Sequence, residues 1–334
     1  MKKTKNILLL CGGGGTEHDV SKISAQYFLG ILEKISDVKA HYLCIEKDGS
    51  RRNLLGEDCE LRKAGEIFNR HTQETISLDY AIPCIHGPPG ENGLIQSVFE
   101  LMGLPYFGAS PEGSLNCFNK VSTKIWLDHL KIPNSPYSFL GSKHQDRSEV
   151  YAFFDSHQDI FVKASHQGSS VGCYHVTKKE ELDQAIDEAF TLSPYVLFEK
   201  TLIGRELEVA VFTHQDKLIA TLPGEIVCPQ KFYTYEEKYS KESGTKTLTI
   251  APDISEEVGQ KIQAFARDAF TLLQLKDLAR VDFFLTQEGE IFLNEINTFP
   301  GHTPISMFPM MLENTGLSYQ DFLQTKIREA TQNS

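Results

Sequence analysis

The 334-residue sequence lacks long hydrophobic runs and an excess of positive charge. No stretch approaches the roughly 20 apolar residues that a membrane-spanning helix needs. Lysine and arginine together number 33 against 45 acidic residues, which gives a formal net charge of −12. Proteins that bind nucleic acids normally present a basic face to the phosphates. We therefore expect neither a membrane span nor a nucleic-acid partner.

The sequence also lacks cysteines at paired spacings. The seven cysteines are odd in number, and none has the Cys-x-x-Cys spacing of zinc and redox motifs. They are Cys11, Cys44, Cys59, Cys84, Cys117, Cys173 and Cys228. A scattered set of this kind is typical of a reducing compartment. The sequence therefore predicts free thiols, no zinc site and a cytoplasmic protein.

The first residues resemble the start of a lipoprotein leader, with Lys2 and Lys3 ahead of the apolar run 7–10 and Cys11. That run has only four residues, whereas the apolar segment of a signal peptide has about 7–15. Leu10 is also large where a processing site needs a small residue. We expect the run to form a first buried strand.

Strand-like and helical patterns alternate over the first hundred residues. This alternation is typical of a doubly wound α/β domain, which we assign to residues 1–108. Gly12 to Gly15 follow the first strand, and the free helix N-terminus after such a turn suits an anionic or polar ligand. The strands are expected at 6–11, 38–45 and 78–85, and the helices at 19–33 and 94–102.

Two further domains follow in this interpretation, at 109–202 and 203–334. The first is expected to mix helices and strands, as in an α+β fold. The second contains a polar stretch, 230–247, that has no clean period and is long enough to predict a functional loop or lid. The first is expected to hold helices from about 119 and at 180–190, and strands at 161–164, 172–176 and 195–199.

The segment 278–297 has the pattern of a β-hairpin, with two strand-like runs on either side of a Glu288-Gly289 turn. A turn at that place sets a register in which the numbers of opposed residues sum to 577. Asp282 then faces Glu295, and Arg280 faces Asn297. Because side chains alternate along a strand, all four lie on one face.

Two directly opposed carboxylates repel each other. The simplest interpretation is a solvated strand face that happens to be acidic. The apolar neighbours at 283–285 and 291–293 instead predict a buried sheet, where unpaired carboxylates are costly. Mg²⁺ prefers oxygen ligands and takes one or two carboxylates, and Arg280 would add a second positive group for a transferring phosphate. We interpret the hairpin as a metal site.

A second motif, Gly168-Ser-Ser-Val-Gly172, matches the Gly-x-Ser-x-Gly elbow of serine hydrolases. That elbow must lead from a strand directly into a helix, whereas residues 172–176 have the pattern of a second strand. A hairpin with a glycine-serine tip can instead fold its N–H groups and hydroxyls over phosphates. Lys163 on the preceding strand could then reach a phosphate as a point charge, although a lysine alone is more often structural.

Four motifs in this order resemble the D-alanine–D-alanine ligases of the ATP-grasp superfamily. The resemblance runs from the glycine turn, with Glu17-His-Asp-Val-Ser21, to Gly301. Its most specific parts are His86-Gly-x-x-Gly-Glu-x-Gly93, Gly168-Ser-Ser-Val-Gly172, Phe232-Tyr-x-Tyr-Glu-x-Lys-Tyr239 and Glu295-x-Asn-Thr-x-Pro-Gly301. The resemblance implies an ATP-grasp fold, in which two domains clamp ATP beside an N-terminal α/β substrate domain.

The resemblance also implies roles for individual residues. ATP would be bound by Lys120, Lys163, Ser169, Ser170, Val171, Glu199, Lys200, Leu202 and Glu206. Two Mg²⁺ or Mn²⁺ ions would be held by Asp282, Glu295 and Asn297. The catalytic set would be Glu17, Ser169, Tyr239, Arg280 and Gly301. The two D-alanines would be bound by Glu17, Val20, Ser21, His86, Lys238, Tyr239, Arg280, Gly301, Ser306 and Met307.

The implied activity is ATP-dependent joining of two D-alanines through an acyl phosphate, for peptidoglycan synthesis in the cytoplasm, by a homodimer whose partners are small molecules. A neutral Tyr239 would favour D-alanine over D-lactate as the acceptor. The sequence departs from the family's usual pattern before Lys120, at Phe299, and at His302 to Met307, near the second-substrate pocket. Ligases for D-serine or D-lactate, a hydrolase using Ser170, and a non-catalytic nucleotide-binding regulator therefore stay open.

Overall fold

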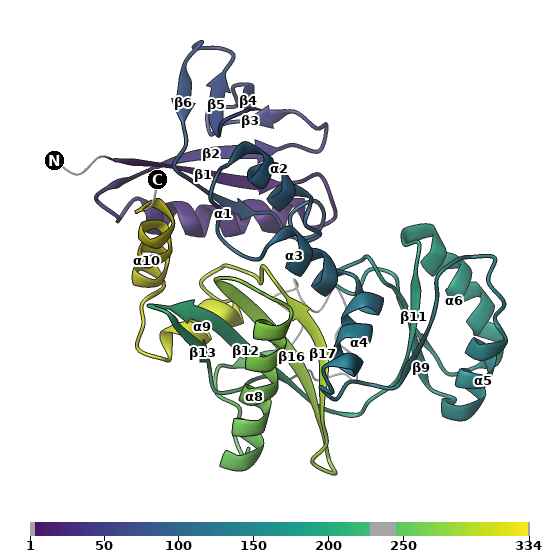
Figure 1. Cartoon of the computed structure of the whole chain (residues 1–334). Helices are drawn as coiled ribbons and strands as arrows, with labels where there is room; N and C mark the ends of the chain where they lie inside the picture. Colours follow the sequence, from purple (N-terminus) through teal and green to yellow (C-terminus); the bar gives the residue numbers. More distant parts are fainter. Residues whose placement is uncertain (1–3, 228–244, 333–334) are drawn as a thin grey trace.

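The computed structural model describes residues 4–227 and 245–332, which fold into several sheets with helices packed on them (Figure 1). Among these residues, no helix is both long and apolar enough to cross a membrane. The cysteines that can be described are all free thiols, as the sequence predicts; Cys228 lies outside the described residues.

The N-terminal part is built on a sheet with the strand order β3-β2-β1-β7, in which β1 is parallel to both of its neighbours. A parallel strand is buried on both faces and therefore reads as a continuous apolar run. The expected strands and helices are all present, with ends shifted by at most two residues. They are β1 (Lys5–Gly12), α1 (His18–Leu32), β2 (Val38–Ile45), β3 (Arg51–Arg52), β7 (Tyr80–Cys84) and α2 (Leu94–Met102).

Alternate residues of β1 pack into two different hydrophobic cores, one on each face of the sheet. Ile7 and Leu9 face α1 and the C-terminal helix α10 (Tyr319–Thr331), whereas Leu8 and Leu10 face the side covered by α2. A small antiparallel sheet that sequence patterns did not predict also packs on this second side. Its strands are β4 (Cys59–Arg62), β5 (Glu66–Asn69) and β6 (Thr75–Ser77).

The middle part contains a second sheet, ordered β10-β9-β11-β8, with its own core between the sheet and two helices (Figure 1). Two helices lead into it, and α4 is capped by Asn119, whose side chain accepts hydrogen bonds from the first free N–H groups. The elements are α3 (Pro111–Phe118), α4 (Lys120–His129), β8 (Tyr137–Leu140), α5 (Ser148–His157), β9 (Ile160–Ala164), β10 (Cys173–Val176), α6 (Lys179–Leu192) and β11 (Val196–Lys200).

The C-terminal part holds a larger sheet, ordered β15-β14-β12-β16-β17, with β13 also paired to β12. Helix α8 covers one face, and α10 returns to the N-terminal sheet beside α1 (Figure 1). The elements are β12 (Gly204–His214), β13 (Lys217–Ala220), β14 (Gly224–Val227), β15 (Lys246–Leu248), α8 (Glu256–Leu272), β16 (Leu278–Thr286), β17 (Ile291–Asn297), α9 (Met307–Glu313) and α10.

The expected loop at 230–247 is too long at its C-terminal end. Lys246 and Thr247 belong to β15, which pairs with β14 in antiparallel register. The rest of that loop lies outside the described residues, except Thr245.

Candidate active site

In its polar half, the hairpin β16–β17 has the register predicted from the sequence. Asp282 lies opposite Glu295, and Arg280 lies opposite Asn297. From Phe283 onward the register shifts by one residue, because a bulge leaves Asn294 as an extra residue on β17. The prediction therefore holds for the polar half of the hairpin and is wrong for the half nearest the turn.

A third carboxylate joins the opposed pair. Glu208 on β12 lies opposite Asp282 on β16, so Glu208, Asp282 and Glu295 form one row across three neighbouring strands. Sequence reasoning missed Glu208, because its place in the row depends on the pairing of two strands that are about seventy residues apart in the chain. The row concentrates negative charge at one place on the sheet.

Arg280 partly neutralises this row. Its guanidinium binds Asp282 through two hydrogen bonds of 2.8 Å, and its Nε lies 3.3 Å from a Glu208 oxygen. Asn297 donates a further hydrogen bond of 3.0 Å to Asp282. Burial alone would lower the pKa of Arg280, but Asp282 and Glu208 raise it well above its ordinary value. Arg280 therefore stays charged at every physiological pH.

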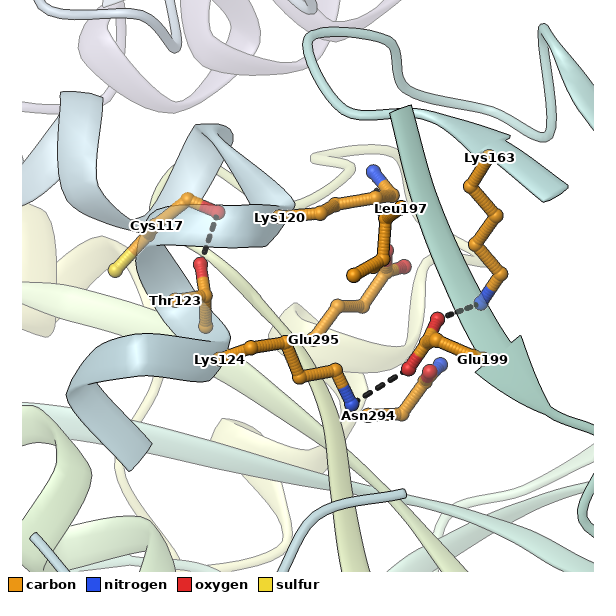
Figure 2. A pocket seen from close by; sticks show the side chains of 9 residues that line it. All are labelled: Cys117, Lys120, Thr123, Lys124, Lys163, Leu197, Glu199, Asn294 and Glu295. Carbon is orange, nitrogen blue, oxygen red and sulfur yellow. Dashed lines mark hydrogen bonds and ion pairs between the residues drawn. The ribbon is translucent and has the colours of Figure 1, made fainter. Parts of the chain in front are cut away.

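Two lysines converge on Glu199 at the end of β11 (Figure 2). The Nζ atoms of Lys124 and Lys163 each lie 2.5 Å from one of its carboxylate oxygens, and the Ser135 hydroxyl also donates to it at 2.5 Å. Lys163 on β9 lies opposite Leu197 on β11. Glu199 is two residues after Leu197 on the same strand, so its side chain lies close to that of Lys163. The side chains of Lys124 and Glu199 are 2% and 5% exposed, and that of Lys163 is 18% exposed, so Lys124 and Glu199 are almost completely removed from water.

The pKa values of this group follow from burial and pairing. Burial would raise the pKa of Glu199, but the charges of Lys124 and Lys163 outweigh it and hold the pKa far below the ordinary value. Burial likewise opposes the charge on Lys163, and Glu199 raises the pKa of Lys163 above its ordinary value. Lys124 is the more deeply buried lysine, and there burial prevails and lowers the pKa.

Lys120 links the lysine group to the carboxylate row. It is the first residue of α4, and its Nζ donates to the Gln167 carbonyl at 2.7 Å and lies 3.9 Å from a Glu295 oxygen. Together these side chains line a pocket between α4, the central sheet and β17 (Figure 2). The pocket is lined by Cys117, Lys120, Thr123, Lys124, Lys163, Leu197, Glu199, Asn294 and Glu295.

The glycine-serine loop joins β9 to β10, which pair as antiparallel strands. The chain continues from Ser170 into β10 and not directly into a helix, so the strand-to-helix elbow of a serine hydrolase is absent from this described segment and that alternative is wrong. Ser169 and Ser170 have positive φ angles of 49° and 61°. This left-handed backbone turns the loop tip, and the Ser169 hydroxyl donates to the Glu17 carboxylate at 2.5 Å.

Glu17, Ser21 and His86 come together at the carboxyl ends of β1 and β7. The Ser21 hydroxyl donates to the Glu17 carbonyl and accepts from the His86 N–H, at 3.0 and 2.9 Å. The His86 ring contacts Ser24 at 2.8 Å. Gly87 has φ of 67°, and a Cβ there would lie 3.0 Å from a Glu17 oxygen. A side chain at 87 would therefore push against the carboxylate.

The remaining site residues predicted by the resemblance are spread along the chain. Lys200 ends β11 and Leu202 follows it, while Glu206 lies on β12 opposite Phe284. Val171 and Ser170 lie in the β9–β10 loop, and Val20 lies half-buried in the first turn of α1. Lys238 and Tyr239 lie outside the described residues.

The segment after β17 contains both buried and exposed residues. Ser306 hydrogen-bonds Thr303 through its hydroxyl, directly over Gly301. Met307 is buried in the core that joins the C-terminal helices to the N-terminal sheet. His302 is fully buried among aromatic rings, with ring centroids 4.9 Å from Phe28 and 4.8 Å from Phe299. Burial, helped by the charge of His86, lowers the pKa of His302 to about 3.

Lys124 and Ser135 are the site residues besides Glu208 that sequence reasoning missed. Lys124 lies one helical turn after Lys120, and this i, i+4 spacing puts both lysines on one side of α4. That spacing was visible in the sequence. The partner, Glu199, could not be identified from it, because the contact joins elements about seventy-five residues apart.

Known proteins match the chain along most of its length. Residues 6–109 match the family described as D-ala D-ala ligase N-terminus, and residues 127–328 match the family described as D-ala D-ala ligase C-terminus. A D-alanine–D-alanine ligase from Shewanella sp. (strain ANA-3) is 48% identical over 96% of this chain and 97% of its own.

Solved structures give the same result. D-alanyl-alanine synthetase A from Vibrio cholerae is 42% identical, with a TM-score of 0.94 and all of both chains covered. A D-Ala:D-Ser ligase from Enterococcus faecalis is 27% identical, with a TM-score of 0.86 over 98% of this chain and all of that one. The expected ATP-grasp fold is confirmed, and the chain belongs to the D-alanine–D-alanine ligase family.

Proposed function

We propose that this protein joins two D-alanines into D-alanyl-D-alanine at the expense of ATP. The observation that carries the proposal is the opposed pair Asp282–Glu295, which lies beside Arg280 and within 3.9 Å of the Lys120 ammonium. Such an arrangement of hard oxygen donors and fixed cations suits a metal-bound nucleotide whose phosphate is transferred. The relatives named as D-alanine–D-alanine ligases support the choice of substrate.

ATP would lie between the central sheet and the carboxylate row. Lys120 and Lys163 would bind phosphate oxygens, with Ser169, Ser170 and the backbone around Val171 closing over them. The turn at Ser169 and Ser170 supports this role, because the hydrogen bond from the Val171 N–H to the Gly168 carbonyl, at 3.0 Å, holds both serines at the tip of the loop. The adenine and ribose would be bound by Glu199, Lys200, Leu202 and Glu206.

The carboxylate row fits a magnesium or manganese site. Asp282, Glu295 and Asn297 supply oxygen donors from two adjacent strands, and Glu208 adds a carboxylate next to Asp282. Hard divalent cations prefer such ligands, and a cation would turn the repulsion along the row into attraction. Two bound Mg²⁺ ions would neutralise phosphate charge during transfer.

The chain's residues would then act mainly by position and charge. The carboxylate of the first D-alanine attacks the terminal phosphorus of ATP, forming an acyl phosphate as ADP leaves. The amine of the second D-alanine attacks the acyl carbon, and phosphate leaves. Arg280 and the Gly301 amide would stabilise the oxyanion of that second step.

Glu17, Ser21, Val20 and His86 would hold the first D-alanine, with the Glu17 carboxylate facing its ammonium. The 2.5 Å contact between Glu17 and Ser169 supports this placement, because it joins the substrate side to the phosphate loop. Lys238, Ser306 and Met307 would hold the second D-alanine. Tyr239 would join Glu17 and Ser169 to close the site and exclude water from the acyl phosphate.

A phosphate-release assay with ATP, Mg²⁺ and a panel of D-amino acids tests the proposal. D-alanine alone should support rapid phosphate release, and omitting either ATP or Mg²⁺ should abolish product. Rapid formation of product without nucleotide would contradict the proposal.

A related ligase specificity is the second candidate, since the Enterococcus faecalis structure that this chain resembles is a D-Ala:D-Ser ligase. Tyr239 decides between acceptors in our proposal. A neutral tyrosine does not repel the ammonium of D-alanine, whereas a cationic group there would favour the uncharged hydroxyl of D-lactate.

We therefore expect D-alanyl-D-alanine as the main product from mixed D-alanine and D-lactate at neutral pH, measured by chromatography. Tyr239→Phe should loosen closure and raise the ratio of ester to peptide. Predominant D-alanyl-D-lactate from the unaltered protein would show that residues around His302 outweigh Tyr239.

We further propose a cytoplasmic homodimer with small molecules as its only substrates and three domains bounded near residues 108 and 202. A separate core, whose described residues all lie between 140 and 198, supports the middle domain. Helix α10 packs on the N-terminal sheet, so the outer two domains share a core. Leu94 and Leu101, two turns apart on α2 and 58% and 90% exposed, support a subunit contact.

A further inference from the structure

A second group of side chains that can bind a metal lies outside the carboxylate row. One of its members, His18, follows Glu17 in the chain. His18 is the first residue of α1, Cys44 lies on β2, and Glu46 follows the end of β2. One ligand atom from each lies within 4.8 Å of the other two. We propose that His18, Cys44 and Glu46 bind a thiophilic divalent cation of the zinc class, contrary to the expectation from cysteine spacing that the chain has no zinc site. The proposal does not depend on the ligase activity.

Local structure explains why the three side chains meet. Cys44 and Glu46 are two residues apart on an extended segment, so their side chains leave the backbone on the same side. Helix α1 packs on that side of the sheet. The first residue of the helix therefore lies over the end of β2, and the His18 Nε2 atom is 3.6 Å from a Glu46 oxygen.

The distances between the three ligand atoms would suit a tetrahedral site if the atoms moved closer together. Zinc binds sulfur at about 2.3 Å and nitrogen at about 2.0 Å, which separates neighbouring ligand atoms by roughly 3.5 Å in a tetrahedron. The pair His18–Glu46 already has this separation. A water molecule would supply the fourth ligand.

Charge and burial also fit. His18 and Cys44 are 3% and 1% exposed, whereas the Glu46 side chain is 28% exposed and offers an entry from solvent. When the cation binds, the Cys44 thiol releases its proton to solvent and the sulfur–metal bond forms. One thiolate and one carboxylate then balance the 2+ charge, so no net charge is buried. Lys22, 4.0 Å from Glu46 and 41% exposed, can turn away into solvent.

The bound cation would also alter the glycine turn. The Gly14 N–H donates to His18 Nδ1 at 3.4 Å, which is long for a hydrogen bond. Ligation through Nε2 places the ring proton on Nδ1 and removes this acceptor. The cost is small because the contact is weak, but the change occurs next to Glu17.

Cobalt titration tests the site, since Co²⁺ bound to a thiolate has a charge-transfer absorption in the near ultraviolet. We expect the reduced, metal-free protein to develop this band with one equivalent of Co²⁺ in the presence of excess Mg²⁺, and Zn²⁺ to remove it. Cobalt on the Asp282–Glu295 row gives no such band, because that row has no sulfur. A wild-type protein without the band would overturn the proposal.

Variants assign the ligands. Cys44→Ala should abolish the band, and Glu46→Gln should weaken Co²⁺ binding by about 10-fold or more. Cys59→Ala and Cys173→Ala, which remove thiols elsewhere, should leave it unchanged. A band that persists in Cys44→Ala would also overturn the proposal.

X-ray absorption of the zinc-loaded, unaltered protein identifies the atoms bound to zinc and does not depend on the folding of a variant. One sulfur with three nitrogen or oxygen neighbours is expected. A shell with no sulfur or with several sulfurs would contradict the assignment.

Discussion

Asp282→Asn and Glu295→Gln should each lower kcat/KM for dipeptide formation by about 100-fold or more while the fold survives. Both changes keep the size of the side chain and remove the negative charge that would bind a divalent cation. In the free protein, Asp282→Asn also removes one of the two carboxylates that pair with Arg280, so it should be the more damaging of the two. Initial rates across a Mg²⁺ titration measure the effect.

Glu290→Gln is the matched control, because Glu290 is exposed in the turn of the same hairpin. It should keep full activity and an unchanged Mg²⁺ dependence. If both Asp282→Asn and Glu295→Gln behaved like Glu290→Gln, the metal assignment would be wrong.

The second large effect is on stability. Glu199→Gln should destabilise the central sheet by about 3–5 kcal/mol, because it leaves Lys124 and Lys163 buried without their counter-charge. Lys124→Met should cost much less, since it removes one buried cation and leaves the pair of Glu199 and Lys163. Hydrogen exchange of the β9 and β11 amides, followed during chemical unfolding, measures the stability of both variants.

Glu181→Gln, a change at an exposed carboxylate on α6, serves as the control and should be close to neutral. A destabilisation by Glu199→Gln no larger than that of Glu181→Gln would show that the lysines do not depend on Glu199.

The stability that Glu199 contributes through its pairing with Lys124 and Lys163 should depend on pH. The pKa of Glu199 in the folded protein lies below its ordinary value of 4.5, so the unfolded chain takes up a proton first as the pH falls. The stabilisation is therefore complete above about pH 4.5 and declines below it. The difference in stability between the unaltered protein and Glu199→Gln should narrow in that acid range.

The sequence predicted the site best where local rules decide the geometry. The two-residue period of the strands put Asp282, Glu295, Arg280 and Asn297 on one face, but the pairs nearest the turn are shifted by one residue from the predicted register. Asp282 lies opposite Glu295 as predicted because the bulge at Asn294, which has no comparable local signal, offsets that shift. The row became complete only with Glu208, whose pairing with Asp282 depends on the tertiary fold.

The lysine group shows the same limit. Lys163 was identified from its strand and the loop after it, but its partner was not, because the contact with Glu199 requires the order of the central sheet. The strands β4 to β6 were missed for a different reason. They are short, partly exposed and mixed in polarity, so they lack a strong apolar period.

The central claim is that ATP activates the carboxylate of D-alanine as an acyl phosphate. D-alanine labelled with ¹⁸O in its carboxylate tests this directly, by mass spectrometry of the phosphate released with ATP and Mg²⁺. One labelled oxygen should move from the carboxylate to phosphate for each D-alanyl-D-alanine formed. Unlabelled phosphate released in step with dipeptide would contradict the account.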